Sequence, residues 1–316
     1  MALSLSHSAA IPRTALAGRP RARRRFAASG GPWLFLAPII AIFVVLYAIP
    51  LGQSLWFSFT DANGYTTDMH WIGFANYASA FKDPEMLSAL WFTLGYAVVT
   101  TVLVTCLAIP LAVVLNTRFF GRDVVRSVFF FPAVPSIAVL GMVWGFILNP
   151  LGSGVLNSAL HAVAGIGPVP WLSDPRLAQI SVIVVAVWAQ TGWHAILYLA
   201  YLQSIPSDYY DAATIDGAGR VRMFRSITLP LLTPAITVSQ LLLMTGGLKV
   251  YDLPFTLTHG GPGFATRTVT QSLIEQGVAQ ADIGKASALA VLFLLLVGAI
   301  ILGQMTISRR LEARYT

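Results

Sequence analysis

Polar and aromatic side chains interrupt an apolar stretch between residues 177 and 204. They are Trp188, Gln190, Thr191, Trp193 and His194. An indole ring stacks on the C–H face of a sugar ring, and a side-chain amide hydrogen-bonds hydroxyl groups. The cluster therefore favours carbohydrate binding, with a tryptophan belt at a membrane interface as the competing interpretation. Both tryptophans lie well inside the stretch, which favours an interior site. His194 alone is more typical of a satisfied histidine than of a metal ligand or a proton relay.

Two charged residues, Lys249 and Asp252, lie in a second apolar stretch that runs from Leu229 to Leu257. A charge inside a membrane-spanning segment is costly, so it usually faces a cavity or a partner. In one continuous helix, residues three positions apart share a face. Two interpretations stay open. Either the pair lines a polar substrate pathway on the face that carries Thr245, or the two side chains form an ion pair and line nothing.

Gly246 and Gly247 precede this charged pair in the same stretch. Glycine in a membrane helix usually allows a second helix to approach closely, and this is the default expectation here. A helix break that lines a site near the middle of the membrane is the alternative.

Sequence motifs of enzyme chemistry are absent. The chain has no GxxxxGK[ST] phosphate loop, no HExxH helix and no GxSxG turn. Its single cysteine, Cys106, excludes an internal disulfide framework and a cysteine-based metal cluster. We therefore expect no enzyme activity, no metal and no cofactor bound by this chain itself.

The composition is that of an integral membrane protein, because 56% of the 316 residues are hydrophobic and only 10% are charged. A helix needs about 20 apolar residues to cross the hydrocarbon core. Six stretches are long enough, and only helices satisfy their backbone in lipid. These predicted spans are Trp33–Phe57, Leu87–Leu115, Val128–Leu148, Leu177–Ser204, Leu229–Leu257 and Ala286–Ile307.

The basic residues predict how these spans are oriented. The net charge of +7 first suggests nucleic-acid binding. With six spans, however, 15 of the 20 Lys and Arg residues fall on one side of the membrane. By the positive-inside rule that side is the cytoplasm, so both termini and the segment 207–230 are predicted to be cytoplasmic. Residues 1–30, with six Arg and no acid, are predicted to form a disordered basic tail. The charge is then explained by topology, and no nucleic-acid partner is expected.

The polar segment Ser207–Pro230 lies between the fourth and fifth predicted spans. Ser207 suits a helix N-cap, and Asp208 and Asp211 suit the first turn of that helix. Gly217 and Gly219 interrupt the helix, and a second helix is predicted from Arg220 to Thr228, before Pro230. The segment is therefore predicted to be a helix–turn–helix unit at the membrane surface.

This segment resembles the EAA loop of ABC importer permeases, which docks on an ATPase subunit. The pattern is an acid, two alanines, a glycine and a spaced I-x-L-P, with Asp standing here where Glu is usual. The matching residues are Asp211, Ala212, Ala213, Asp216, Gly217, Ala218, Phe224, Ile227, Leu229 and Pro230. The competing interpretation is an amphipathic loop on lipid headgroups.

The three predicted outer loops are Thr60–Glu85, Asn149–Arg176 and His259–Lys285, and two of them also resemble those of sugar permeases. The first contains Trp71, Gly73, Asn76, Tyr77, Asp83 and Pro84. The third matches LTxGGPxxxT of the maltose and glycerol-3-phosphate branch, and its matching positions are Leu257, Thr258, Gly260, Gly261, Pro262 and Thr266. In maltose-type permeases, the positions that face the sugar match Ala186, Ala189, Gln190, Trp193, Leu243, Gly246 and Gly247.

The resemblance implies an all-helical, six-span permease domain at residues 31–316, with the type I ABC importer fold, in the plasma or inner membrane. It implies a second permease subunit, an ATPase dimer that binds ATP, an extracytoplasmic solute-binding lipoprotein and a sugar substrate. The expected ATPase-coupling segment is 207–230, and the expected substrate pathway comprises Trp188, Gln190, Trp193, Gly246, Gly247, Lys249 and Asp252. A self-sufficient channel or proton-coupled transporter is the alternative, and a membrane scaffold is a third possibility.

Overall fold

A computed structural model describes residues 31–313, and the predicted tail at residues 1–30 lies outside them. The described part is helical. It contains no strand, and its one isolated antiparallel bridge joins Thr60 to Trp71. Internal contacts divide the chain into two units, with the boundary after Pro50. The all-helical class predicted from the sequence is confirmed.

The first unit holds α1 (Gly31–Phe43), the π-helical turn η2 (Val44–Ala48) and the start of α2 (Ile49–Phe57). Residues 35–57 form a helix that is long and apolar enough to cross a membrane, as predicted.

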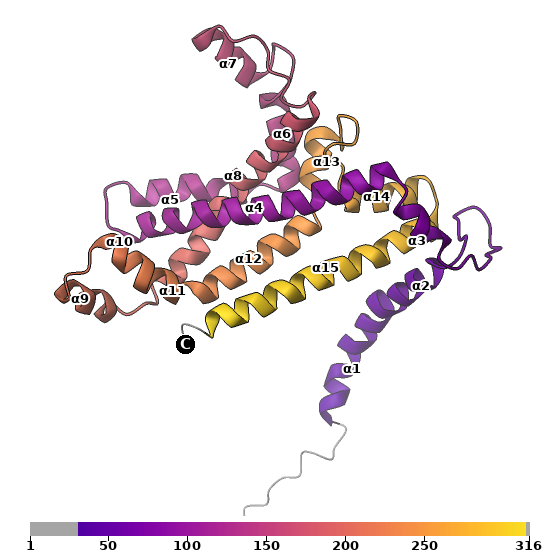
Figure 1. Ribbon diagram of the computed structural model, residues 1–316, viewed down its shortest axis with the longest axis horizontal. Helices are drawn as coiled ribbons and strands as arrows, with labels where there is room; N and C mark the ends of the chain where they lie inside the picture. Colours follow the sequence, from indigo (N-terminus) through magenta and orange to yellow (C-terminus); the bar gives the residue numbers. More distant parts are fainter. Residues whose placement is uncertain (1–30, 314–316) are drawn as a thin grey trace, which may run out of the picture. The chain divides into compact units, whose positions relative to one another are not determined.

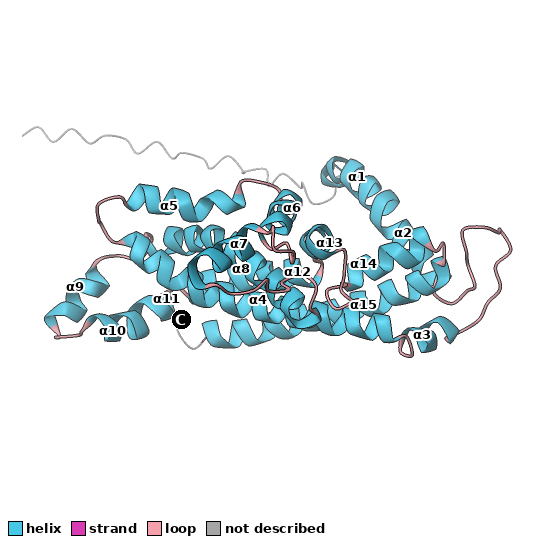
Figure 2. Ribbon diagram, turned by 90° about the horizontal axis from the view of Figure 1, so that it is seen from above, coloured by secondary structure: helices cyan, strands magenta, loops and turns pink. Residues whose placement is uncertain are grey.

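Four long helices form the framework of the second unit, and three of them are uninterrupted candidate spans (Figures 1 and 2). α4 packs against α8 and α12, and α12 packs in turn against α15. At 1.5 Å per residue, the 33 residues of α4 extend about 50 Å, more than the thickness of the hydrocarbon core. The bounds are α4 Pro84–Asn116, α8 Pro175–Leu202, α12 Thr233–Leu248 and α15 Ile283–Glu312.

The starts of α4 and α8 follow from local sequence. In both, an aspartate precedes a proline at the first helical position, where the missing N–H costs nothing. The Asp83 carboxylate accepts from the N–H groups of Glu85 and Met86. Asp174 does the same for the second and third residues of α8. These side chains satisfy N–H groups that have no partner inside the helix.

The third predicted span is broken. α5 (Arg122–Phe130) and the short 3-10 turn η3 (Phe131–Ala133) meet α6 (Ile137–Ile147) at an angle of 97°. Pro132 and Pro135 lie at this break, and proline cannot donate the backbone hydrogen bond that would continue a helix. The predicted span Val128–Leu148 therefore corresponds to a sharply bent pair of helices, which the prediction did not include.

The fifth predicted span also differs from its expected bounds. α12 ends at Leu248, and a separate helix, α13 (Asp252–Thr258), follows after a short break. On its other side α12 meets the preceding helical segment, residues 220–231, at 65°. The described residues thus hold four uninterrupted candidate spans, or six if each bent pair counts as one.

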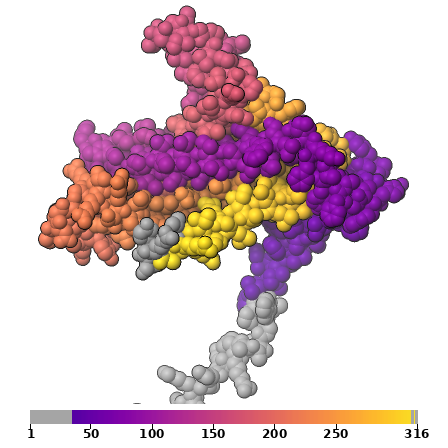
Figure 3. Space-filling view, viewed as in Figure 1, coloured from indigo at the N-terminus to yellow at the C-terminus, as the bar shows by residue number. Residues whose placement is uncertain are grey.

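Shorter elements lie in the segment 207–230 and in the connections between the long helices. In Figure 3 the segment 207–230, coloured orange, lies at one end of the second unit, away from α14. The remaining elements are α3 (Ala75–Ala80), α7 (Val155–Ala164), α9 (Asp208–Ile215), α10 (Arg220–Met223), the π-helical turn η4 (Phe224–Thr228), α11 (Leu229–Leu231), α14 (Val269–Ile274) and the π-helical turn η5 (Glu275–Ala279).

Candidate functional site

A cavity of about 310 Å³ lies between α8 and the bend that joins η3 to α6. It is formed by the proline-containing bend on one side and one face of α8 on the other. Its lining residues are Pro132, Ala133, Pro135, Ile137, Leu140, Ala189, Gln190, Trp193 and His194. Two of the predicted pathway residues, Gln190 and Trp193, thus lie together in one cavity.

The contact between α8 and α5 depends on Gly192. A Cβ atom at this position would collide with the backbone carbonyl of Phe129. The glycine lets the end of α5 approach the backbone of α8, next to Trp193 in the cavity wall. Gly192 therefore helps to set the shape of the cavity, although it does not line the cavity itself.

The two tryptophans of α8 have different surroundings. Both are 41% exposed, but the Trp193 ring lies edge-on to His194 with the centroids 4.7 Å apart. Trp188 is not among the residues that line the cavity. Its ring instead meets Trp144 of α6 edge-on, with a centroid distance of 5.4 Å. Of the two tryptophans, only Trp193 lines the cavity together with Gln190.

His194 is a hydrogen-bonded histidine of the helix interface. It is 4% exposed, and its Nδ1 lies 2.7 Å from Oγ of Ser239 on α12. This agrees with the expectation of a satisfied histidine. No group of three or more His, Cys, Asp or Glu side chains within the described part of the chain is arranged to hold a metal ion.

Lys249 and Asp252 do not share a helix face. Lys249 follows the last residue of α12, and Asp252 begins α13 after a break. Both side chains are exposed, and no ion pair within 4.0 Å joins them in the structure from residue 31 to 313. The predicted common face was therefore wrong, because the helix ends between the two charges.

Gly246 and Gly247 continue α12 and do not break it. Gly247 is buried, and a Cβ atom there would lie 2.8 Å from Cα of Ala97 on α4. This is the close helix packing that was the default expectation. Gly246 is exposed and has no neighbour within 4 Å of such an atom. The break occurs just beyond the pair, after Leu248.

The segment 207–230 forms the predicted helix, turn and helix. α9 ends in a turn in which the N–H of Ala218 donates to Ala213 and Gly217 has a φ of +75°. Residues with a Cβ rarely adopt this left-handed conformation, so glycine is required. Asp208 and Asp211 occupy the first turn of α9, as expected, but Ser207 makes no side-chain capping bond.

The helices of this segment, from α9 to α11 (residues 208–231), form a helical hairpin. Its second arm continues through Pro230 and does not end before it. α10 widens into η4 over Phe224–Thr228, two residues ahead of the proline. Proline at 230 lacks an N–H, and its ring crowds the carbonyl one turn earlier, which the wider turn accommodates.

Side chains tie the hairpin together and to the helix bundle. The hydroxyls of Tyr210 and Thr228 lie 3.0 Å apart and join α9 to η4. Phe224 and Leu229 pack against the core cluster shared by α4, α8 and α12. The outer surface remains apolar in places, and Ile215 is 87% exposed. The hairpin is thus anchored on one side and open on the other.

An ion-pair network that sequence analysis missed fastens the connection after α13. The guanidinium of Arg267, 8% exposed, pairs with Glu85 at the start of α4 and lies 3.1 Å from Glu275. Lys285 Nζ lies 3.0 Å from Asp83. The isolated charges in the sequence were the only available signal, because the partners lie up to some 200 positions away.

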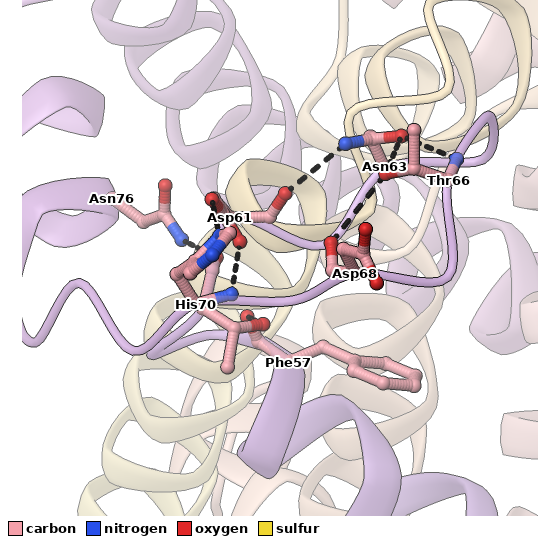
Figure 4. A network of polar contacts seen from close by, with 8 residues as sticks. Phe57, Asp61, Asn63, Thr66, Asp68, His70 and Asn76 are labelled. Carbon is pink, nitrogen blue, oxygen red and sulfur yellow. Dashed lines mark hydrogen bonds and ion pairs between the residues drawn. The ribbon is translucent and has the colours of Figure 1, made fainter.

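A second polar network orders the connection after α2 (Figure 4). The N–H of His70 donates to Asp61 at 2.6 Å, and Asn76 donates to the carbonyls of Ser58 and Thr60. The His70 N–H is the main cause that holds the pKa of the Asp61 carboxyl below its usual value. Asn63 closes the neighbouring turn by accepting from the N–H groups of Tyr65 and Thr66.

Known proteins resemble the chain over most of its length. Residues 105–314 match the family model described as "binding-protein-dependent transport system inner membrane component". A probable ABC transporter permease protein of Sinorhizobium fredii is 38% identical over 93% of this chain and 94% of its own length. A trehalose/maltose transport system permease protein of Thermococcus litoralis is 33% identical over 84% of this chain and 89% of its own.

Solved structures agree at the level of the fold. A chain from the crystal structure of a bacterial ABC transporter involved in the import of the acidic polysaccharide alginate superposes with a TM-score of 0.77. The match covers 88% of this chain and 95% of that chain at 24% identity. Members of the matched family are transport components, so this chain is a transport subunit and not an enzyme. It belongs to the family of binding-protein-dependent transport system inner membrane components, the permease subunits of ABC transporters.

Proposed function

We propose that this permease subunit carries a sugar or sugar derivative into the cell in an ATP-driven ABC importer. The observation that carries the proposal is one connected core. It anchors the helical hairpin at residues 208–231 through Phe224 and Leu229, and it also includes α8, whose side chains line the cavity. An exposed hairpin fixed to such a core can pass a push from a partner to the helices around a cavity. The names of relatives that transport trehalose and maltose, or multiple sugars, support a sugar as the cargo.

The proposed substrate site is the cavity on α8. Trp193 supplies a face for stacking on a sugar ring, and Gln190 supplies a donor and an acceptor for hydroxyl groups. Trp188, Lys249 and Asp252 lie apart from this lining, and Gly247 is closed by α4. We therefore place the first contacts of the sugar at Gln190 and Trp193.

The proposed partners are a second, similar permease subunit and a dimer of cytoplasmic ATPase subunits. An extracytoplasmic solute-binding lipoprotein delivers the sugar. Asp211 and Gly217 of the motif are exposed and Ala213 is half-buried, and small side chains of this kind would let an ATPase surface approach closely. In this arrangement both termini and the hairpin face the cytoplasm. ATP-driven closure of the ATPases would then switch the cavity between its two access states.

Affinity purification tests this assignment directly. The chain is tagged at its C-terminus in its native membrane, solubilised in a detergent that preserves a known ABC importer, and analysed by mass spectrometry. Recovery of a second permease, an ATPase and a binding lipoprotein is the expected result. A matched variant, Gly217→Asp, should lose the ATPase while it keeps the second permease. Purification of the chain alone, with uptake that is insensitive to ATP depletion, would favour a self-sufficient channel or proton-coupled transporter.

A further inference from the structure

The polar side chains of the cavity all come from α8. Of its nine lining residues, only Gln190, Trp193 and His194 carry a nitrogen or oxygen atom in the side chain. Residues three and four positions apart share a helix face, so the helical period brings these three together. The other wall, made by residues 132–140, offers only apolar side chains. Any hydrogen bond from a side chain to a sugar in this cavity must therefore come from α8.

One of the two ring nitrogens of His194 is not used by the protein. The residue is 4% exposed, and its Nδ1 lies 2.7 Å from Oγ of Ser239 on α12. The other nitrogen, Nε2, makes no hydrogen bond within residues 31–313. It is also not one of the fully enclosed polar atoms that lack a partner, as the Tyr198 hydroxyl is. Nε2 is therefore open to a space beside the ring.

The cavity supplies that space. His194 lines it, and the Nδ1 side of the ring is turned to α12, so the Nε2 side remains for the cavity. A neutral imidazole has one donor nitrogen and one acceptor nitrogen. Whichever role Nδ1 takes towards Ser239, Nε2 has the other. A sugar hydroxyl fits both cases, because it can donate and accept.

We propose that His194 is a third sugar contact in the cavity, and that Ser239 is a positioning residue that holds the imidazole with Nε2 towards the sugar. This inference rests on the proposed function, because it takes the cavity as the substrate site. Gln190 lies one turn before His194 on the same face, so the amide and the imidazole can bond neighbouring hydroxyl groups while Trp193 stacks on the sugar ring. A bound sugar gives a buried nitrogen the partner that the protein does not provide.

Two substitutions at His194 separate the roles of its two nitrogens. The amide of asparagine reaches about as far as Nδ1, and the amide of glutamine about as far as Nε2. His194→Asn should therefore keep the bond to Ser239 and lose the group that faces the cavity, and His194→Gln should do the opposite. Ser239→Ala removes the positioning hydroxyl. Thr101→Val is its matched control, because the buried Thr101 hydroxyl bonds only Ala97 of the same helix.

Transport and thermal stability are both measured on the purified complex. Proteoliposomes that contain it are supplied with ATP and the co-purified binding protein. The probe is the sugar that this binding protein binds among maltose, trehalose, diacetylchitobiose and arabinotriose, a panel taken from the names of relatives. The kcat/KM of uptake falls when an interaction with the transported sugar is lost. The Tm of the nucleotide-free complex reports the hydrogen bond between α8 and α12.

We expect His194→Asn to lower kcat/KM about fivefold, which corresponds to the loss of one net hydrogen bond. His194→Gln should stay within about twofold of the parent on the same estimate but lower the Tm, because it leaves the Ser239 hydroxyl without its partner. The two variants should thus rank in opposite orders for transport and for Tm. Ser239→Ala should lower kcat/KM about twofold to threefold on that estimate, since the ring is no longer held, and Thr101→Val should transport like the parent.

Two outcomes would contradict different statements. If His194→Asn transports as well as His194→Gln or better, His194 only joins α8 to α12, and the inference is overturned while the proposed function stands. A parent that takes up none of the probe sugars, or takes them up without ATP, would contradict the proposed function and with it the inference. If neither His194 variant assembles, Ser239→Ala still decides, because a kcat/KM equal to that of Thr101→Val would overturn the inference.

Discussion

The hydroxyl groups of Tyr210 and Thr228 lie 3.0 Å apart and connect the two arms of the hairpin. Thr228 is buried and sits two residues before Pro230, at the end of the widened turn η4. Tyr210 comes from α9, on the far side of the glycine turn. A force on α9 can therefore reach the segment that leads into α12 by two routes. One is this hydrogen bond, and the other is the backbone of the glycine turn.

Tyr210→Phe should loosen the hairpin without unfolding the bundle. A partly buried hydrogen bond contributes about 1 kcal/mol, so amide exchange in α9 should accelerate about fivefold. Hydrogen–deuterium exchange of the purified complex measures this effect. Tyr209→Phe is the matched control, because the Tyr209 side chain is exposed and makes no hydrogen bond within the part of the chain that the structure describes. Equal exchange in both variants would show that the bond does not stabilise the hairpin.

The glycine turn provides a sharper comparison. Gly217 has a φ of +75°, whereas Gly219 has a φ of −71° that any residue adopts. Gly217→Ala should destabilise the hairpin by about 1–2 kcal/mol, and Gly219→Ala should have little effect. ATPase recovery in the affinity purification and uptake by whole cells report the difference. If the two alanine variants behave alike, backbone conformation at Gly217 does not matter for docking.

Sequence patterns predicted those parts of the fold that local chemistry decides. The apolar runs of α4, α8 and α15 and the hairpin around Gly217 are all of this kind. The end of α12 was not predictable in this way, because no glycine or proline marks positions 249 to 251. The bend in the third span was not predictable from Pro132 and Pro135 alone, because prolines are tolerated in many membrane helices and their effect depends on what surrounds them.

The candidate site could be predicted by residue type but not by arrangement. Gln190 and Trp193 are three positions apart on one helix, so their common face follows from the helical period. The same period turns Trp188 away from that face, but its contact with Trp144 of a different helix could not be predicted from the sequence. Arg267 and Ser239 were missed for the same reason, since their partners Glu85 and His194 are distant in sequence.

Gly192 should tolerate no side chain. An added methyl would collide with the backbone carbonyl of Phe129, which cannot move as a flexible side chain can. Gly192→Ala should therefore cost about 1–3 kcal/mol or more and lower the Tm of the solubilised complex by several degrees. Gly95→Ala on α4 is the control, because no atom of this chain lies within 4 Å of a Cβ there. An unchanged Tm in Gly192→Ala would contradict the close approach of α5 to α8.

The proposed orientation is tested by labelling single cysteines in a Cys106→Ser background. Thr67 lies in the connection between α2 and α3, and Arg118 lies between α4 and α5, and both are exposed. A membrane-impermeant maleimide should label Thr67→Cys in intact cells. It should label Arg118→Cys only after the membrane has been permeabilised. The reverse pattern would invert the proposed topology. Labelling of both sites from outside would show either that α4 does not cross the membrane between them or that the cells were leaky, and a cytoplasmic marker protein distinguishes these two cases.

Trp193→Ala should weaken transport and leave assembly intact, because the indole lines the cavity. Loss of one aromatic stacking contact should raise the KM for the sugar by about threefold to tenfold. Trp188→Ala is the internal control, since that ring packs on Trp144 and lies outside the lining. Uptake is measured with the sugar that the co-purified binding protein binds, and assembly is checked by recovery of the ATPase. The expected result is a raised KM in Trp193→Ala alone. A raised KM in Trp188→Ala alone would move the sugar out of this cavity, towards the interface of α6 and α8.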